Sequence, residues 1–155
     1  MGRELRMVPP NYQHPKHSHP FRHKEEYTPM HDETHAEAMK EWEAEHDEDE
    51  DPPKPEKYRP DWKKEDMTWF QVYETVSEGT PITPPFATRE ELVEYLVANG
   101  DFWDQRRRRE ARPGRFQMPC EPWARDAAMS FVFGDGWAPT FVGVGDNIKR
   151  GIDHV

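Results

Sequence analysis

The sequence contains a single cysteine, Cys120, so no disulfide can form within the chain, and a reducing compartment is the expected environment. No apolar run approaches the ~20 residues that a membrane-spanning helix needs, and no apolar signal segment follows the start of the chain. These two absences predict a soluble, cytoplasmic protein that does not bind membranes.

Recurring catalytic and metal-binding motifs are also missing from the sequence. It has no glycine-rich phosphate loop, no HExxH or GxSxG motif, and no paired-cysteine zinc pattern. No internal repeat is visible either. We therefore expect neither an enzyme nor a bound cofactor.

Apolar residues are scarce as well, at 34% of 155 residues, while another 34% are charged and 16 residues are proline. This composition predicts one domain with a modest core, accompanied by segments that remain outside it. The net charge of -10 disfavours general attraction to nucleic acid or to anionic membranes.

The N-terminal segment 1–31 is rich in proline and histidine, and its prolines prevent a long helix. We predict an extended arm over these residues. Four imidazoles lie close together in it and are weak candidate metal ligands, because no thiolate accompanies them and two prolines interrupt their spacing. They are His14, His17, His19 and His23.

The next segment, 32–51, predicts an acidic helix capped by Asp32 or Thr34 and followed by further acidic residues. Residues 25–51 hold thirteen acidic residues against Lys40. Charge runs are usually solvated surface. The alternative is a nucleic-acid mimic that places carboxylates where a basic cleft of a partner expects phosphates. The partner-binding residues would then be Glu41, Trp42, Glu45, Glu48 and Asp49.

A proline-rich linker over 52–66 precedes a compact part over 67–155, in which we expect the order strand, helix, helix, strand, strand. The strand lies at 68–76, where both faces carry apolar residues, so an interior position is expected. The first helix begins at Thr88, with Glu91 completing a capping box, and stops at Gly100. A second helix is predicted at 121–133, and a hairpin joins 140–144 to 148–152. The expected fold is a small α+β domain with a mainly antiparallel sheet.

An arginine run occupies 106–109 and allows three interpretations. The guanidinium groups could contact phosphates, form an exposed loop, or pair internally with the acidic segment 41–51. Only Trp103 and Phe116 flank the run, although proteins that bind single strands usually interleave aromatic platforms with charge. Nucleic-acid contact through Arg106, Arg107, Arg108 and Arg109 is therefore the less favoured interpretation.

Several motifs resemble a family of small, uncharacterised proteins carried by phages and prophages of Gram-negative bacteria. The matching stretches are MGRELR and VPPNY near the start, SEGTP at 77–81, and GWAP at 136–139. The resemblance implies a phage accessory protein in the cytoplasm of a bacterial host. We expect it to bind a host or phage protein complex and to block an antiviral defence system. The alternative is a phage assembly protein that uses its N-terminal arm, and the oligomeric state stays open.

Overall fold

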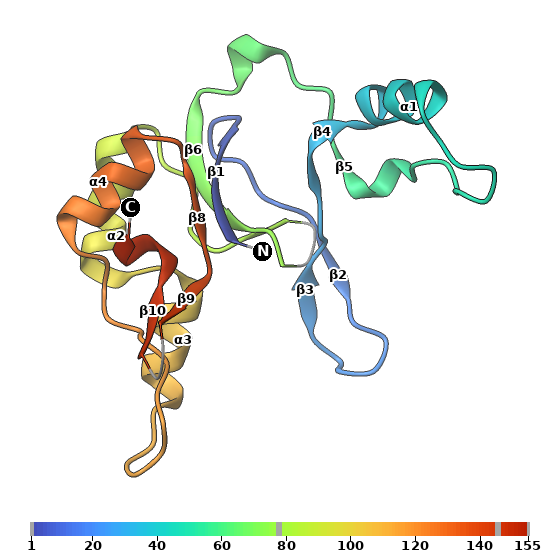
Figure 1. Cartoon of the computed structure of the whole chain (residues 1–155). Coiled ribbons are helices and arrows are strands. Elements are labelled where there is room, and N and C mark those ends of the chain that lie inside the picture. The colour runs from blue at the N-terminus through green and yellow to red at the C-terminus, as the bar shows by residue number, and fades with distance from the viewer. Residues whose placement is uncertain (1, 77–78, 145–146, 155) are drawn as a thin grey trace.

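The structure, a computed structural model, describes residues 2–76, 79–144 and 147–154 and is built around a four-stranded antiparallel sheet (Figure 1). The strand order is β7-β6-β1-β8. The strands span β1 Gly2–Val8, β6 Trp69–Glu74, β7 Thr80–Pro81 and β8 Trp137–Pro139. The helices and this sheet make the α+β fold that the sequence predicts.

The first strand corrects the prediction of an extended arm over 1–31. Residues Gly2–Val8 form β1, which lies inside the sheet and pairs with β6 on one side and β8 on the other. Arg3 and Arg6 are buried in this strand, although charged residues in a sequence normally indicate an exposed segment. The rest of the predicted arm contains a hairpin of β2 Lys16–Ser18 and β3 Glu25–Tyr27.

Three helices accompany the sheet, and the apolar core lies where they meet it. They are α2 Arg89–Asn99, α3 Phe102–Glu110 and α4 Arg125–Phe133. In Figure 1, α2 and α4 lie together on one side of the sheet. The core includes residues of the sheet, of α2 and α4, and of the segment before α4: Phe70, Val72, Leu92, Leu96, Trp123, Ala128 and Phe131.

The start and end of α2 lie where the sequence predicts them, although among the described residues only the Thr88 half of the predicted capping box forms. The Thr88 hydroxyl accepts a hydrogen bond from the Glu91 N–H at 3.1 Å, and Gly100 ends the helix with φ 72°. Only glycine adopts this left-handed conformation without strain. The other predicted helix begins at Arg125 rather than at residue 121, because the Trp123 N–H donates to the Leu96 carbonyl outside any helix.

The arginine run forms part of α3, and this corrects its interpretation as an exposed loop. Asp101 caps the helix by accepting hydrogen bonds from the N–H groups of Trp103 and Asp104, at 2.9 and 3.0 Å. The Asp104 carboxylate in turn accepts a hydrogen bond from the Asp101 N–H, which completes a capping box. The run therefore lies in the last turns of the helix, where positive charge is favourable.

The opposite face of the sheet is covered by the segment that follows β1. Tyr73 of β6 is buried under His14, and the guanidinium of Arg6 lies 4.4 Å from the centre of its ring. Tyr12 packs edge-on against Trp62, with 4.8 Å between ring centres. β6 is thus an interior strand, as expected, with helices on one face and the N-terminal segment that follows β1 on the other.

A separate lobe projects from this body and holds the acidic helix (Figure 1). It consists of β4 His31–Thr34, α1 His35–Ala44, η1 Pro55–Lys57 and β5 Tyr58–Arg59, and η2 Lys64–Asp66 leads back to β6. Thr34 caps α1 in a capping box with Glu37. The helix is shorter than the predicted segment 32–51 because its last turn has no basic residue and acidic residues follow it.

The C-terminal hairpin forms near the predicted positions, and among the described residues it makes a two-stranded sheet separate from the main one. Its strands are β9 Phe141–Val144 and β10 Asn147–Arg150, followed by η3 Gly151–His154. The predicted turn is Gly145-Asp146-Asn147, of which Asn147 instead begins β10. Gly145 and Asp146 lie outside the described residues, as do Ser77 and Glu78. No helix in the described ranges is long and apolar enough to cross a membrane.

Candidate functional site

Charged side chains gather in two places with opposite environments, and the first is a buried joint between β1, α3 and β10. Its four members are at most 3% exposed: Arg3, Asp101, Asp104 and Arg150. Arg3 Nε lies 2.5 Å from Asp101 Oδ2, and Arg150 lies 3.2 Å from Asp104 Oδ1. We call these four residues the buried charge joint.

The electrostatics of the joint are those of a closed structural site. The pKa of Asp104 is raised above its ordinary value, chiefly by burial and then by the neighbouring Asp101 carboxylate. The Asp101 N–H, Arg150 and Arg3 act in the opposite direction. Trp123 Nε1 also donates to Asp104 Oδ2 at 3.0 Å. Sequence analysis missed this joint. Its only signal was Asp101 placed directly before an aromatic and basic helical stretch.

The second gathering of charge is the acidic lobe, defined as residues 31–59, which carries the predicted partner-binding residues. Glu41 and Glu45 lie one helical turn apart, and Glu48 and Asp49 follow in the loop. All four are exposed. None of the four forms an ion pair with a basic side chain in the described part of the chain. The structure thus leaves these four carboxylates open to solvent.

The lobe also encloses a hollow of about 590 Å³ between α1 and the returning chain. Trp42 lines it together with Tyr58 and the carboxylates of Glu41 and Glu45. The indole of Trp42 stacks on His46 with 4.0 Å between ring centres, which fixes its orientation. His35 Nε2 lies 2.9 Å from the Pro53 carbonyl and ties the returning chain to the helix. The acidic surface therefore rests on a shaped support.

Three arginines of α3, Arg106, Arg107 and Arg108, are engaged within their own part of the molecule rather than with the acidic segment 41–51. Arg106 pairs with Glu110 at 2.9 Å, and Arg107 lies 3.9 Å from Asp104 and over the ring of Phe141. Arg108 donates to the carbonyls of Asn99 and Cys120. Arg109 is exposed at the end of the helix.

The four histidines of the N-terminal segment do not converge on one point. His14 is buried between the Tyr73 hydroxyl, 3.1 Å from Nδ1, and the Thr28 carbonyl, 2.6 Å from Nε2. Because a carbonyl only accepts, Nε2 carries a proton. His17 contacts Thr28 Oγ1, and His19 Nδ1 accepts from the backbone of Phe21. Across the described ranges, no three histidine, cysteine, aspartate or glutamate side chains are grouped to hold a metal ion.

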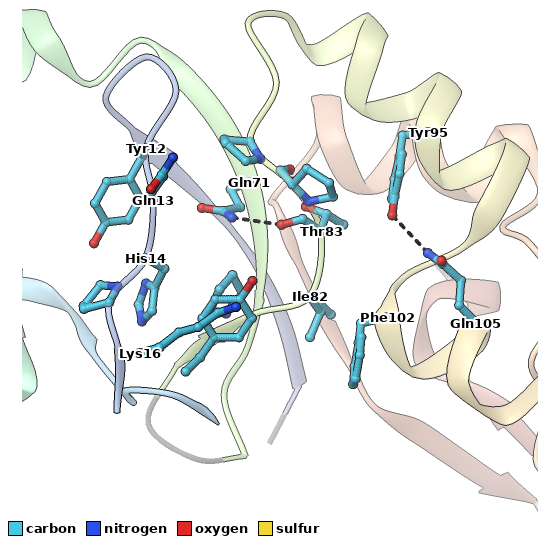
Figure 2. A pocket seen from close by; sticks show the side chains of 15 residues that line it. Tyr12, Gln13, His14, Lys16, Gln71, Ile82, Thr83, Tyr95, Phe102 and Gln105 are labelled. Carbon is cyan, nitrogen blue, oxygen red and sulfur yellow. Dashed lines mark hydrogen bonds between the residues drawn. The ribbon is translucent and has the colours of Figure 1, made fainter. Parts of the chain in front are cut away.

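A groove that sequence analysis missed lies between the β2–β3 hairpin and α3. Figure 2 shows Tyr12, Gln13, His14 and Lys16 on one side, Tyr95, Phe102 and Gln105 on the other, and Gln71, Ile82 and Thr83 between them. The hollow measures about 640 Å³. Tyr95 belongs to the predicted apolar stripe of α2, yet it faces this groove, where its hydroxyl accepts from Gln105 Nε2 at 3.0 Å. Its walls come from segments far apart in sequence.

Burial affects the titratable groups at this groove. It raises the pKa of Tyr12 to about 12, so the Tyr12 phenol stays protonated and remains a hydrogen-bond donor. Burial also lowers the pKa of His14, and this effect outweighs the hydrogen bond to the Thr28 carbonyl, which acts to raise it.

Comparison of the chain with protein-family models, with curated proteins and with solved structures gives no significant match.

Proposed function

We propose that this protein acts by binding another protein, with the acidic lobe occupying a basic cleft that normally holds nucleic acid. The observation that carries the proposal is the pair of charge environments described above. Glu41, Glu45, Glu48 and Asp49 of the lobe are exposed and form no ion pair among the described residues, whereas Arg106, Arg107 and Arg108 of α3 are engaged. The protein would thus offer anionic rather than cationic charge to a partner.

The lobe suits this role because its carboxylates stand on an ordered support. Thr34 and Glu37 fix the start of α1, and Arg59 pairs with Asp32 at 3.4 Å beside it. A preformed array loses less conformational entropy on binding than a disordered acidic tail does. Trp42 adds an aromatic ring at the hollow, of the kind that anchors protein interfaces.

Two further elements of the proposal rest on the phage-like motifs of the sequence. The partner is a host or phage complex in the bacterial cytoplasm, and occupation of its cleft inhibits an antiviral defence system. The arginine contacts within α3 make direct nucleic-acid binding the weaker alternative. The assembly alternative is also weaker, because β1 lies inside the sheet and cannot serve as a threading arm.

The experiment is a pull-down of the Strep-tagged chain from a defended host, with nuclease added. The test variant neutralises the lobe through Glu41→Gln, Glu45→Gln, Glu48→Gln and Asp49→Asn. A matched control changes the net charge equally at exposed sites elsewhere, through Glu90→Gln, Glu91→Gln, Asp126→Asn and Asp135→Asn. We expect the lobe variant to lose at least tenfold in affinity and the control to retain its partner.

Competition distinguishes a nucleic-acid cleft from another basic surface. Added duplex DNA or RNA should displace the protein from the purified partner, and binding should weaken as the salt concentration rises. Equal binding by the wild-type chain and the lobe variant would refute charge mimicry. A partner that binds the chain and nucleic acid at the same time would refute competition for the cleft.

A further inference from the structure

The groove beside the hairpin is longer than the single hollow in Figure 2. A second hollow of about 580 Å³ adjoins it and shares five lining residues with it. The shared residues are Lys16, Tyr27, Pro81, Ile82 and Phe102. We call the continuous feature the hairpin groove. Its length suits an extended polypeptide segment better than a compact small molecule.

Aromatic rings and prolines form most of the apolar walls of the hairpin groove. Tyr12 and Tyr95 stand at one end, Phe102 and Tyr27 lie in the shared middle, and Trp103 lines the far end. Phe102 is 44% exposed and Tyr27 is 41% exposed, so both side chains are partly open to solvent. Grooves lined by aromatic rings recognise proline-rich segments, whose rigid polyproline II conformation loses little entropy on binding.

The hydrogen-bonding groups of the groove favour a ligand that offers carbonyl oxygens. Tyr95 already accepts from Gln105, so its own O–H is available to donate. The Gln13 side chain is exposed, and Lys16 brings three N–H donors. The side-chain oxygen of Gln71 lies 3.0 Å from the Tyr73 hydroxyl oxygen. A proline-rich segment matches this excess of donors because it has carbonyl groups but few N–H groups.

The edge strand at the floor of the groove argues against recognition by strand addition. Pro81 has no N–H to donate, and the outward Ile82 carbonyl already accepts from the Phe102 N–H at 2.8 Å. A β-strand ligand needs a regular row of such groups along a sheet edge. We therefore expect the hairpin groove to contact the side chains and carbonyl oxygens of its ligand rather than to pair with the ligand as an added β-strand.

The charged residues at the hairpin end of the groove indicate which residues should flank the bound segment. The basic lining residues are Lys16, Arg22, Lys24 and Arg106, and the acidic ones are Glu25, Glu26 and Glu74. Arg22 pairs with Glu26 at 3.5 Å, Arg106 pairs with Glu110 at 2.9 Å, and Glu74 accepts the Trp103 indole N–H at 2.7 Å. Lys16 and Lys24 then face the single carboxylate of Glu25, which leaves an excess of positive charge. We propose that the hairpin groove binds a proline-rich segment of a partner protein whose flanking residues are acidic.

Calorimetric titration of the whole chain with synthetic peptides tests this inference. The probe is a proline octamer with two aspartates at each end. One comparison peptide replaces the prolines by alternating glycine and serine, and another replaces the aspartates by lysines. We expect the glycine–serine peptide to bind at least tenfold more weakly and the lysine-flanked peptide several-fold more weakly.

Substitutions in the protein locate the site. Phe102→Ser and Tyr27→Ser should each weaken binding of the probe about tenfold, the effect of losing one ring contact of roughly 1.4 kcal/mol. Phe116→Ser is the matched control, since Phe116 is 79% exposed and does not line the groove. Unchanged urea midpoints would show that the variants stay folded.

Four outcomes would overturn the inference. These are absence of binding, equal binding of the proline and glycine–serine peptides, equal binding of both flank types, or equal loss in the Phe116 control. Sedimentation of the chain alone addresses a second copy as the occupant. Association that disappears when Pro52, Pro53 and Pro55 become alanine would assign the groove to a second copy instead. Because the peptide titrations and the Phe102 and Tyr27 variants do not involve the acidic lobe, their failure leaves the proposed function standing.

Discussion

The buried charge joint and the acidic lobe use the same kinds of side chain for opposite purposes. In the joint, Arg3 and Asp101 are out of water and paired at 2.5 Å, so each charge depends on its partner. In the lobe, Glu41 and Glu48 are exposed and hydrated. Buried charges are tolerated only when they are paired, whereas exposed carboxylates remain available for a partner. Burial, rather than residue type, separates the structural charges from the candidate binding charges.

The largest expected effect comes from breaking the joint. Asp101→Asn keeps a good helix cap but removes the charge that neutralises Arg3, so the effect on charge is separated from the effect on capping. We expect the free energy of unfolding in urea to fall by about 3–5 kcal/mol, because one buried charge loses its partner. The matched change Asp49→Asn in the lobe should alter it by less than ~0.5 kcal/mol. Similar small effects of both changes would show that the joint is not buried in solution.

The pH dependence of stability should give an intermediate effect through His14. Burial lowers the pKa of His14 from its ordinary value of 6.5, so the folded protein holds this imidazole neutral while the unfolded chain protonates it. Unfolding therefore takes up a proton below about pH 6.5, and the free energy of unfolding falls as the pH decreases through this region. For one proton the slope is at most about 1.4 kcal/mol per pH unit.

Comparison of two substitutions isolates this contribution. His14→Gln should flatten the slope of stability against pH just below pH 6.5. His17→Gln, at an exposed position, should leave the slope unchanged. Urea unfolding at a series of pH values measures both. An unchanged slope in His14→Gln would mean that this side chain has the same proton affinity in the folded and unfolded chains.

The smallest effect is expected for a surface ion pair that lies outside both charged regions. Glu94 and Arg125 approach to 2.5 Å between α2 and α4, but both side chains are more than half exposed. The pKa of Glu94 is lowered chiefly by its hydrogen bond with Arg125. Water and salt screen such pairs. A double-mutant cycle with Glu94→Gln and Arg125→Gln should give no coupling beyond experimental error at physiological salt. A large coupling energy would show that this exposed pair stabilises the fold in the way expected of the buried charge joint.

Local signals in the sequence were sufficient for the elements that carry their own boundaries. Thr88 and Gly100 delimit α2, and alternating aromatic and β-branched residues identify β6. The exposed acidic residues of the lobe were also identified, because a dense run of carboxylates cannot be buried without partners. These features depend on neighbours within a few positions of the chain.

Contacts between distant residues decided the rest. The sequence alone determined an α+β protein with an acidic surface, a capped α2 and a C-terminal hairpin. The interior position of the strand Gly2–Val8 became evident only in the tertiary structure. Arg3 can be buried there because Asp101, 98 positions away in the sequence, neutralises its charge. The hairpin groove was likewise decided by folding, because Tyr27 and Phe102 meet across it from separate segments. Hydrophobic periodicity reports the neighbours along a chain, whereas the pairing of buried charges and the walls of a groove depend on which distant segments fold together.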